Sequence, residues 1–151
     1  MNITLEKYGS SIKIDVRHTY YFLQSGVVME NRRSWRPKTK EDMLLHAYWQ
    51  KVGGTIFTEV PIGGPGGRGE WPPGCTQMRL DGVRIVTREK DIRNYIESDD
   101  DFMKLINKYP VEIIEIKMSL NRTAIGQIIA GNDMFTREYK VNAKSKLFSV
   151  R

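Results

Sequence analysis

The 151-residue sequence contains one cysteine, Cys75, and only two histidines. A single thiol cannot form an internal disulfide, and without a Cys/His cluster a zinc site is not expected. The sequence has no run of about 18 apolar residues, which a membrane-spanning helix needs, and its first residues lack the pattern of a signal peptide. We therefore expect a cytoplasmic protein without membrane contact.

The composition is that of a globular protein, with 40% hydrophobic and 28% charged residues. The length fits one domain with its own core, so we expect residues 1–151 to form a single α/β (α+β) domain. The net charge of +6 is compatible with a polyanionic partner but does not require one.

Basic residues gather in two stretches. The first contains Arg32, Arg33 and Arg36 with Trp35 among them, and the second is the tail with its lysines. Basic side chains next to an aromatic ring suit phosphate contact combined with base stacking. A solvated connector and a soluble tail would show the same composition, so both interpretations stay open here.

Alternating apolar residues predict a β-hairpin within residues 3–23, followed by a polar connector up to residue 38. A helix is predicted next, with Thr39 as its N-cap and Gly53-Gly54 at its end. A short strand over residues 55–62 leads into a Gly/Pro-rich loop that spans residues 63–74. Arg68 and Trp71 in this loop could contact a nucleic acid, or the loop could be only a connection.

Residues 78–86 allow two interpretations. Asp81-Gly82 between alternating residues is a common turn of a two-residue hairpin. The arms of such a hairpin would be very short. We therefore favour a single strand that carries Asp81, in which Gly82 permits a close approach.

Residues 111–118 predict an interior strand, because apolar side chains occur on both of its faces. Glu115 and Lys117 share one face with Ile113, whereas Ile114 and Ile116 lie on the other. A carboxylate and an ammonium are costly to bury unless they are paired or bind something. Glu-x-Lys could be an ordinary ion pair, or it could hold a metal ion beside a water molecule.

Two more helices complete the pattern. Helix-capping residues at Ser98 predict one helix, which we interpret as an insertion over residues 89–109. Another helix should begin at Asn121 or Thr123. Its apolar face is expected to contain Ile125, Ile128, Ile129 and Phe135, and a last strand is predicted over residues 146–150.

The order of elements from residue 39 onward, α-β-β-β-α-β, resembles the core of the PD-(D/E)xK nuclease superfamily. The matching residues are Asp81 on the second strand and Glu115-Ile116-Lys117 on the third. The resemblance implies a restriction endonuclease-like core, a central mixed sheet flanked by helices, over residues 39–151. Residues 1–38 would be an N-terminal β extension and basic connector.

The resemblance also implies roles at the site. Asp81 and Glu115 would ligate Mg²⁺, for which Mn²⁺ can substitute, and the Ile116 carbonyl would supply a further oxygen ligand. Lys117, with a pKa lowered beside the metal, would orient the attacking water and help to deprotonate it. Many members carry an acidic residue on the first core helix, and Glu41 is the best candidate for it, with Asp42 second.

Two further candidates come from subgroups of the superfamily. His46 on the first helix is a possible metal ligand, and Gln127 on the helix after Glu-x-Lys could contact the nucleic acid, although Gly131 stands where those members have Tyr. The implied function is Mg²⁺-dependent hydrolysis of phosphodiester bonds in DNA. Enzymes that cut both strands often work as dimers, so a homodimer is one arrangement that the resemblance allows. The alternative is a non-catalytic nucleic-acid-binding or assembly protein on the same fold.

Overall fold

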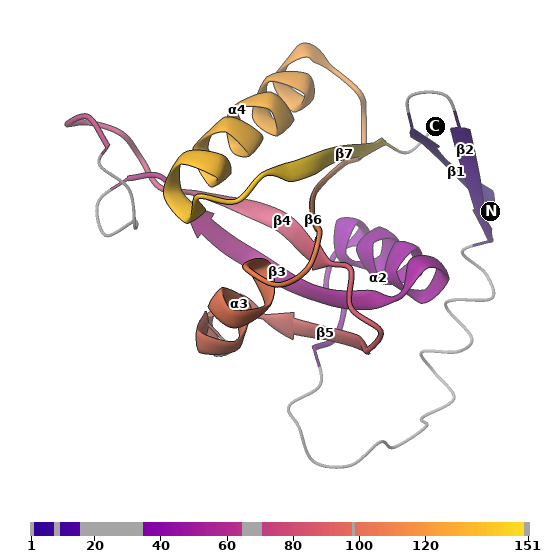
Figure 1. Cartoon of the computed structure of the whole chain (residues 1–151). Helices are drawn as coiled ribbons and strands as arrows, with labels where there is room; N and C mark the ends of the chain where they lie inside the picture. The colour runs from indigo at the N-terminus through magenta and orange to yellow at the C-terminus, as the bar shows by residue number, and fades with distance from the viewer. Residues whose placement is uncertain (1, 8–9, 16–34, 65–70, 98, 150–151) are drawn as a thin grey trace.

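The structure, a computed structural model, describes residues 2–7, 10–15, 35–64, 71–97 and 99–149 (Figure 1). The N-terminal elements are strands β1 (Asn2–Lys7) and β2 (Ser10–Asp15), which pair as an antiparallel hairpin. The remaining elements are α2 (Lys40–Val52), β3 (Gly54–Ile62), β4 (Met78–Ile85), β5 (Lys90–Asn94), the 3-10 helix η1 (Tyr95–Glu97), α3 (Asp99–Ile106), β6 (Val111–Lys117), α4 (Arg122–Tyr139) and β7 (Ala143–Ser149).

The centre of the molecule is a five-stranded mixed sheet in the order β5-β3-β4-β6-β7. The central strand β4 runs antiparallel to both of its neighbours, β3 and β6. The outer strands are parallel to theirs: β5 to β3, and β7 to β6. Helix α2 packs on one face of the sheet, and α3 and α4 pack on the other. The chain is therefore an α+β protein, as the sequence predicts.

Helix α2 begins where its sequence predicts. The Thr39 side chain accepts a hydrogen bond from the Asp42 N–H, and the Asp42 carboxylate accepts one from the Thr39 N–H. This capping box satisfies amide groups that lie at the start of a helix and lack helical partners. The apolar stripe is buried through Leu44, Leu45 and Tyr48, and the helix ends at Gly53, whose φ is 64°. The first turn thereby holds Glu41 and Asp42 at one end of the sheet.

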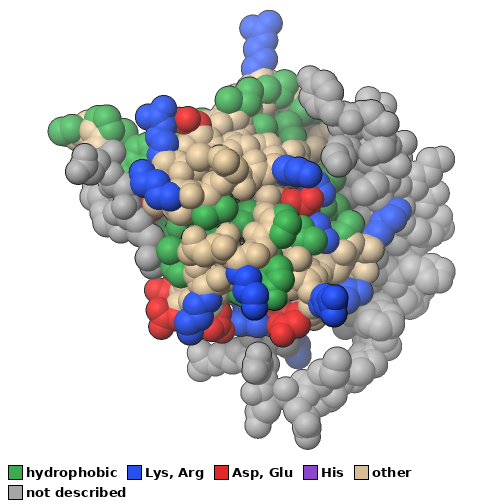
Figure 2. Space-filling model, in the orientation of Figure 1, with side chains coloured by type: hydrophobic (Ala, Val, Ile, Leu, Met, Phe, Trp, Pro, Cys, Tyr) green, Lys and Arg blue, Asp and Glu red, His purple; other side chains and the backbone are tan. Residues whose placement is uncertain are grey.

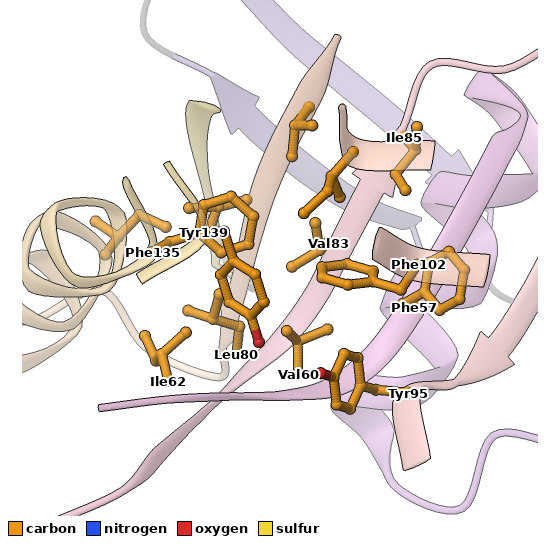
Figure 3. Packing of buried hydrophobic residues seen from close by; sticks show 14 residues of the cluster. Phe57, Val60, Ile62, Leu80, Val83, Ile85, Tyr95, Phe102, Phe135 and Tyr139 are labelled. Atoms are coloured by element: carbon orange, nitrogen blue, oxygen red, sulfur yellow. The ribbon is translucent and has the colours of Figure 1, made fainter. Parts of the chain in front are cut away.

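The larger core cluster lies between the sheet and the helices α3 and α4 (Figure 3). Its centre is Phe102, which contacts four aromatic rings with centroids 5.0 to 6.5 Å away: Phe57, Tyr95, Phe135 and Tyr139. Edge-to-face contacts of this kind are favourable beyond the area that they bury. They attach the short helix α3 to the sheet.

Strand β6 is an interior strand covered on both faces, as predicted. Ile113 belongs to the core cluster beneath α3 and α4, whereas Ile114 and Ile116 belong to the cluster beneath α2. Residues 78–85 form one strand and not a hairpin, because β4 pairs with β3 on one side and with β6 on the other. A Cβ added to Gly82 would lie 3.1 Å from the Leu45 side chain, so glycine permits the close approach of α2.

Three predictions differ from the structure. The last strand, β7, begins at Ala143 and not at residue 146. The segment at residues 89–109 is not only helical, because β5 adds a short edge strand ahead of α3. Ile125 and Ile129 are exposed and are not part of the apolar face of α4, which is formed by Ile128 and Phe135 among others. The helix packs on the sheet with one narrow side, and both isoleucines fall outside it. Within the described residues, no helix has the length and apolar character needed to cross a membrane.

Candidate functional site

The site lies where β4 and β6 diverge. Their ladder pairs Gly82 with Ile114 and ends there. Beyond it, the N–H of Ile116 donates a hydrogen bond to Asp81 Oδ2 over 2.8 Å, so a side chain takes the place of the neighbouring backbone. Because the N–H and C=O of one strand residue point to the same edge, the Ile116 carbonyl faces the same gap.

An irregularity shared by β3 and β4 frees Asp81 from the sheet. Phe57 and Val60 are buried in the same cluster, although their spacing should place them on opposite faces, and the same holds for Leu80 and Val83. The pairing of β3 with β4 is interrupted at one position, where Asp81 lies opposite Glu59. The backbone of Glu59 is left-handed, with a φ of 58°. The alternation is therefore interrupted at this position, and the Asp81 carboxylate can reach sideways to β6.

Lys117 joins the two predicted carboxylates. Its Nζ lies 2.8 Å from Glu115 Oε1 and 3.7 Å from Asp81 Oδ2. The Glu115 side chain is only 5% exposed, whereas those of Asp81 and Lys117 are 27% and 26% exposed. The structure thus brings together the three residues that the sequence predicts, with Glu115 buried and the other two open to a ligand.

The electrostatics of this cluster are unbalanced, because two carboxylates share one ammonium. Burial and the charge of Glu115 raise the pKa of Asp81 from 3.8 to about 6, against the opposing effects of the Ile116 N–H and Lys117. Glu41 adds to the increase through its charge. Such a group of negative charges is stabilised by any added cation.

The sequence-based expectation of a lowered Lys117 pKa applies to a site with a bound metal ion, whereas in the metal-free protein the pKa shifts upward. Burial alone would lower it, but the hydrogen bond to Glu115 and the charges of Asp81, Glu115 and Glu41 raise the pKa above 10.5. Without a metal ion in the site, Lys117 is therefore a firmly charged ammonium. Its contribution is charge and hydrogen-bond donation.

The donor set fits a magnesium ion held by few protein ligands. Two carboxylates and a carbonyl supply oxygen, which Mg²⁺ prefers, and Mg²⁺ ordinarily keeps several of its waters. Among the described residues there is no group of three or more His, Cys, Asp and Glu side chains that could hold a metal. The candidate site has only two such side chains, Asp81 and Glu115, and takes its third oxygen from the Ile116 carbonyl.

A cavity of about 680 Å³ opens beside Asp81. Its lining contains four carboxylates and three basic side chains: Glu41, Asp42, Glu59, Asp81, Arg36, Lys38 and Arg79. Glu41 therefore lies in the site region, as predicted, and its charge reaches both Asp81 and Lys117. Asp42 lines the cavity as well, although its carboxylate also caps α2. The volume is in the range of pockets that bind small ligands.

Glu59 is the site residue that sequence reasoning missed. It lines the cavity opposite Asp81, and its Oε2 lies 3.6 Å from Arg79 Nη1. A single Glu in the segment Thr-Glu-Val-Pro gives no sign of a left-handed backbone. Only the three-dimensional pairing of β3 with β4 places this carboxylate at the site.

His46, the possible metal ligand, lies in an aromatic group. Its ring stacks on Trp35 with centroids 6.2 Å apart and contacts Trp49 at 5.3 Å. Burial and the charge of Lys90 lower its pKa. The His46 Nδ1 is buried without a hydrogen-bond partner in the described residues, but no contact described for His46 is to Asp81 or Glu115, so its contacts do not support a ligand role at this site.

The predicted nucleic-acid contacts lie in several places. Arg36 lines the cavity, whereas Arg32, Arg33 and Arg68 lie outside the described residues. Trp71 is half-buried and not fully exposed, and its indole N–H is shielded without a hydrogen-bond partner in the described part of the chain. Gln127 is half-buried on α4.

One of the tail lysines is not available to a phosphate. Lys146 Nζ lies 2.7 Å from Glu112 Oε1 and donates a hydrogen bond to the Tyr48 hydroxyl. Its side chain is largely buried. Of the two interpretations of the basic tail, phosphate contact therefore does not apply to Lys146, which pairs inside the protein.

No protein-family model matches the chain, and comparisons with curated proteins and with solved structures found no similar protein. The resemblance to the PD-(D/E)xK superfamily accordingly depends on Asp81, Glu115, Lys117 and the order of the elements.

Proposed function

We propose that this chain is a Mg²⁺-dependent nuclease that hydrolyses phosphodiester bonds in DNA, built on a restriction endonuclease-like core. One observation carries the proposal. The carboxylates of Asp81 and Glu115 surround a single ammonium, Lys117, at the open end of two diverging strands. That arrangement concentrates negative charge beside a cavity and places a hydrogen-bond donor at the same point.

The chain's residues divide the work of hydrolysis. Asp81, Glu115 and the Ile116 carbonyl would hold Mg²⁺ or Mn²⁺. When bound, such an ion lowers the pKa of a water molecule and neutralises charge that develops on the phosphate. Lys117, as an ammonium, orients the attacking water and donates a hydrogen bond to a phosphate oxygen. Because its ammonium contacts both carboxylates, we assign it positioning rather than proton removal.

The cavity is the proposed path of the DNA backbone. Arg36, Lys38 and Arg79 in its lining can neutralise phosphates, and Trp35 offers an aromatic ring near them. Phosphate contacts of this kind do not depend on the base sequence. Glu41 and Glu59 would keep the phosphates away from the carboxylate side of the cavity unless a cation is present.

The proposal is tested by cleavage of labelled linear, circular and branched DNA in Mg²⁺, in Mn²⁺ and in chelator. We expect cleavage with either metal and none in chelator. Asp81→Asn, purified in parallel, is the matched control, because it removes one charge with little change of shape. Cleavage of equal rate by this variant would indicate a contaminating nuclease, and no cleavage of any substrate by the wild type would exclude the function.

A specific observation also supports the second candidate, a DNA-binding protein without catalysis. Lys117 is paired with both carboxylates, so an ammonium already supplies a positive charge at the place of a metal ion. A calorimetric titration with Mg²⁺ separates the two functions. Binding that is lost in Asp81→Asn supports the nuclease, whereas DNA binding without any Mg²⁺ binding supports the second candidate.

A further inference from the structure

The outward side of α4 is unusually apolar for a helix that packs on a sheet. Its buried side is formed by Ala124, Ile128, Gly131 and Phe135. On the opposite side, Ile125 is 45% exposed and Ile129 is 64% exposed. In Figure 2, apolar side chains lie at the upper edge of the molecule, over α4. Two exposed isoleucines one helical turn apart form a continuous apolar row and not isolated surface residues.

The same side carries small residues beside the isoleucines. Gly126 and Ala130 are exposed and are also one turn apart, and a Cβ added to Gly126 would meet no atom within 4 Å. Arg122 precedes this row and Asp133 follows it, and both are exposed. We call this set the outer face of α4: Arg122, Ile125, Gly126, Ile129, Ala130 and Asp133.

The outer face is complementary to itself. If two copies of α4 pack antiparallel with their midpoint between residues 127 and 128, Arg122 lies opposite Asp133 of the partner subunit. In the same register, Ile125 lies opposite Ala130 of the partner subunit, and Gly126 lies opposite Ile129 of the partner subunit. Positive charge thus meets negative charge at both ends, the apolar rows pack together, and the small residues let the two backbones approach. A two-fold axis generates all of these contacts twice, as a symmetric dimer requires.

We propose that the outer face of α4 binds a second copy of this chain, so that the protein forms an antiparallel α4–α4 dimer. Asp133 already pairs with Arg137 of its own helix at 2.9 Å, and its carboxylate, 59% exposed, can accept Arg122 of the partner subunit as well. A stable interface buries about 800 Å² per partner, more than one helix face supplies. The dimer is therefore weak, with a dissociation constant in the micromolar range.

The dimer does not depend on the proposed nuclease activity, and its test uses no DNA. Sedimentation equilibrium over roughly 2 to 200 μM should show a reversible monomer–dimer equilibrium of the wild-type chain, since micromolar association is visible in that range. Ile129→Glu should weaken dimerisation at least about tenfold, because it buries an unpaired charge. Ile96→Glu is the matched control, since Ile96 is 67% exposed on η1 and lies outside the outer face. It should dimerise as the wild type does.

Gly126→Leu separates packing from stability. Leucine should stabilise the exposed helix interior of the monomer relative to glycine, but it should also hold the two helices apart, so the melting temperature rises while the dimer is lost.

The charges supply a reciprocal test. Arg122→Asp alone should weaken the dimer about fivefold, and Arg122→Asp combined with Asp133→Arg should restore it, because the exchanged charges meet again only between two copies. A wild-type chain that stays monomeric at 200 μM, or an unchanged dimer in Ile129→Glu and Gly126→Leu, would overturn the proposal.

Discussion

Strand β6 carries two charged clusters that differ in their balance. Glu112, near its start, is held between two cations: Arg84 Nη1 lies 2.6 Å away and Lys146 Nζ lies 2.7 Å away. Glu115, three residues later, shares the single ammonium of Lys117 with Asp81. The first cluster is closed and has a surplus of positive charge, whereas the second opens to a cavity and has a surplus of negative charge.

The partners of the first cluster show that it is structural. Arg84 also donates hydrogen bonds to the carbonyls of Val52 and Gly53, so it joins β4 to the end of α2. Burial of Glu112 alone would raise its pKa, but the hydrogen bonds and charges of Lys146 and Arg84 lower it. A buried carboxylate therefore marks a candidate site when its charge is left uncompensated, as at Asp81 and Glu115, and not when cations balance it, as at Glu112.

The largest effects on activity are expected at Lys117 and Glu115. Lys117→Ala should reduce the rate of DNA cleavage by about 100- to 1,000-fold, the range for loss of one hydrogen-bond donor to charge that develops in the transition state. Binding of Mg²⁺ and DNA should persist, because Asp81 and Glu115 remain. Single-turnover kinetics with saturating Mg²⁺ measure the chemical step directly.

Glu115→Gln is the companion to that variant. It should lose Mg²⁺ binding and cleavage together, because the substitution removes the charge of a carboxylate that is a proposed ligand of the metal ion. If Lys117→Ala and Glu115→Gln both cleave at the wild-type rate, the cluster around Glu115 is not an active site and does not differ in function from the cluster around Glu112.

The largest effect on stability is expected at Glu112. Glu112→Ala leaves Arg84 and Lys146 buried beside each other without a carboxylate, which should cost about 3–5 kcal/mol in the free energy of unfolding. Urea denaturation measures this loss. Replacement of the whole cluster by apolar residues, Arg84→Met with Glu112→Leu and Lys146→Met, should be far less damaging, because no unpaired charge remains. Equal losses in both variants would show that Glu112 acts through packing and not through charge.

The two clusters should respond to pH in opposite directions. The pKa of Asp81 is raised to about 6, so its contribution to stability is present in full below pH 3.8 and is lost as the pH rises through 6. The loss amounts to about 3 kcal/mol in metal-free protein. The pKa of Glu112 is lowered, so its contribution is present above pH 4.5 and is lost on acidification.

The pH dependence is measured as the difference in unfolding free energy between wild type and variant. For Asp81→Asn, this difference should favour the variant more strongly at pH 7.5 than at pH 5. Adding Mg²⁺ at pH 7.5 should reverse it. An identical pH profile of the wild type and Asp81→Asn would show that Asp81 is not held in an unfavourable charge environment.

The smallest effect is expected at Arg36. Arg36→Ala should reduce the slope of log K against log salt concentration for DNA binding by about 0.9, the value for one phosphate contact. Lys108→Ala is a suitable control, since Lys108 is exposed and does not line the cavity. Adding Arg32→Ala and Arg33→Ala should reduce the slope further. If Arg36→Ala and Lys108→Ala have the same slope, the cavity is not the path of the DNA backbone.

The sequence predicts the elements of the core because their signals are local. The capping pattern at Thr39 and the apolar residues on both faces of residues 111–118 depend on nearby residues only. Strand β5 was missed because Lys-Asp-Ile-Arg-Asn contains a single apolar residue. Its strand conformation comes from pairing with β3, which no local pattern shows.

The candidate site also combines features that local sequence predicts with features that depend on distant parts of the chain. Spacing alone predicts that Glu115 and Lys117 share a face. Their meeting with Asp81 depends on the interrupted alternation opposite Glu59. The closed pairing of Lys146 depends on a strand far along the chain, because Lys146 lies 34 residues beyond Glu112. For Ile125 and Ile129 the local pattern is misleading. Their helical spacing predicts a buried face, but spacing alone does not show which surface would cover it.

Strand β7 has a consequence for the order in which a growing chain can complete its fold. It pairs with β6 along its whole length and brings Lys146 to Glu112, yet it is made after every other described element. Until residues 143–149 have left the ribosome, β6 is an edge strand, with unpaired backbone groups along an apolar segment and only one cation beside Glu112. Such an edge invites pairing with other chains. The last described strand therefore protects the strand that carries the proposed site from aggregation during synthesis.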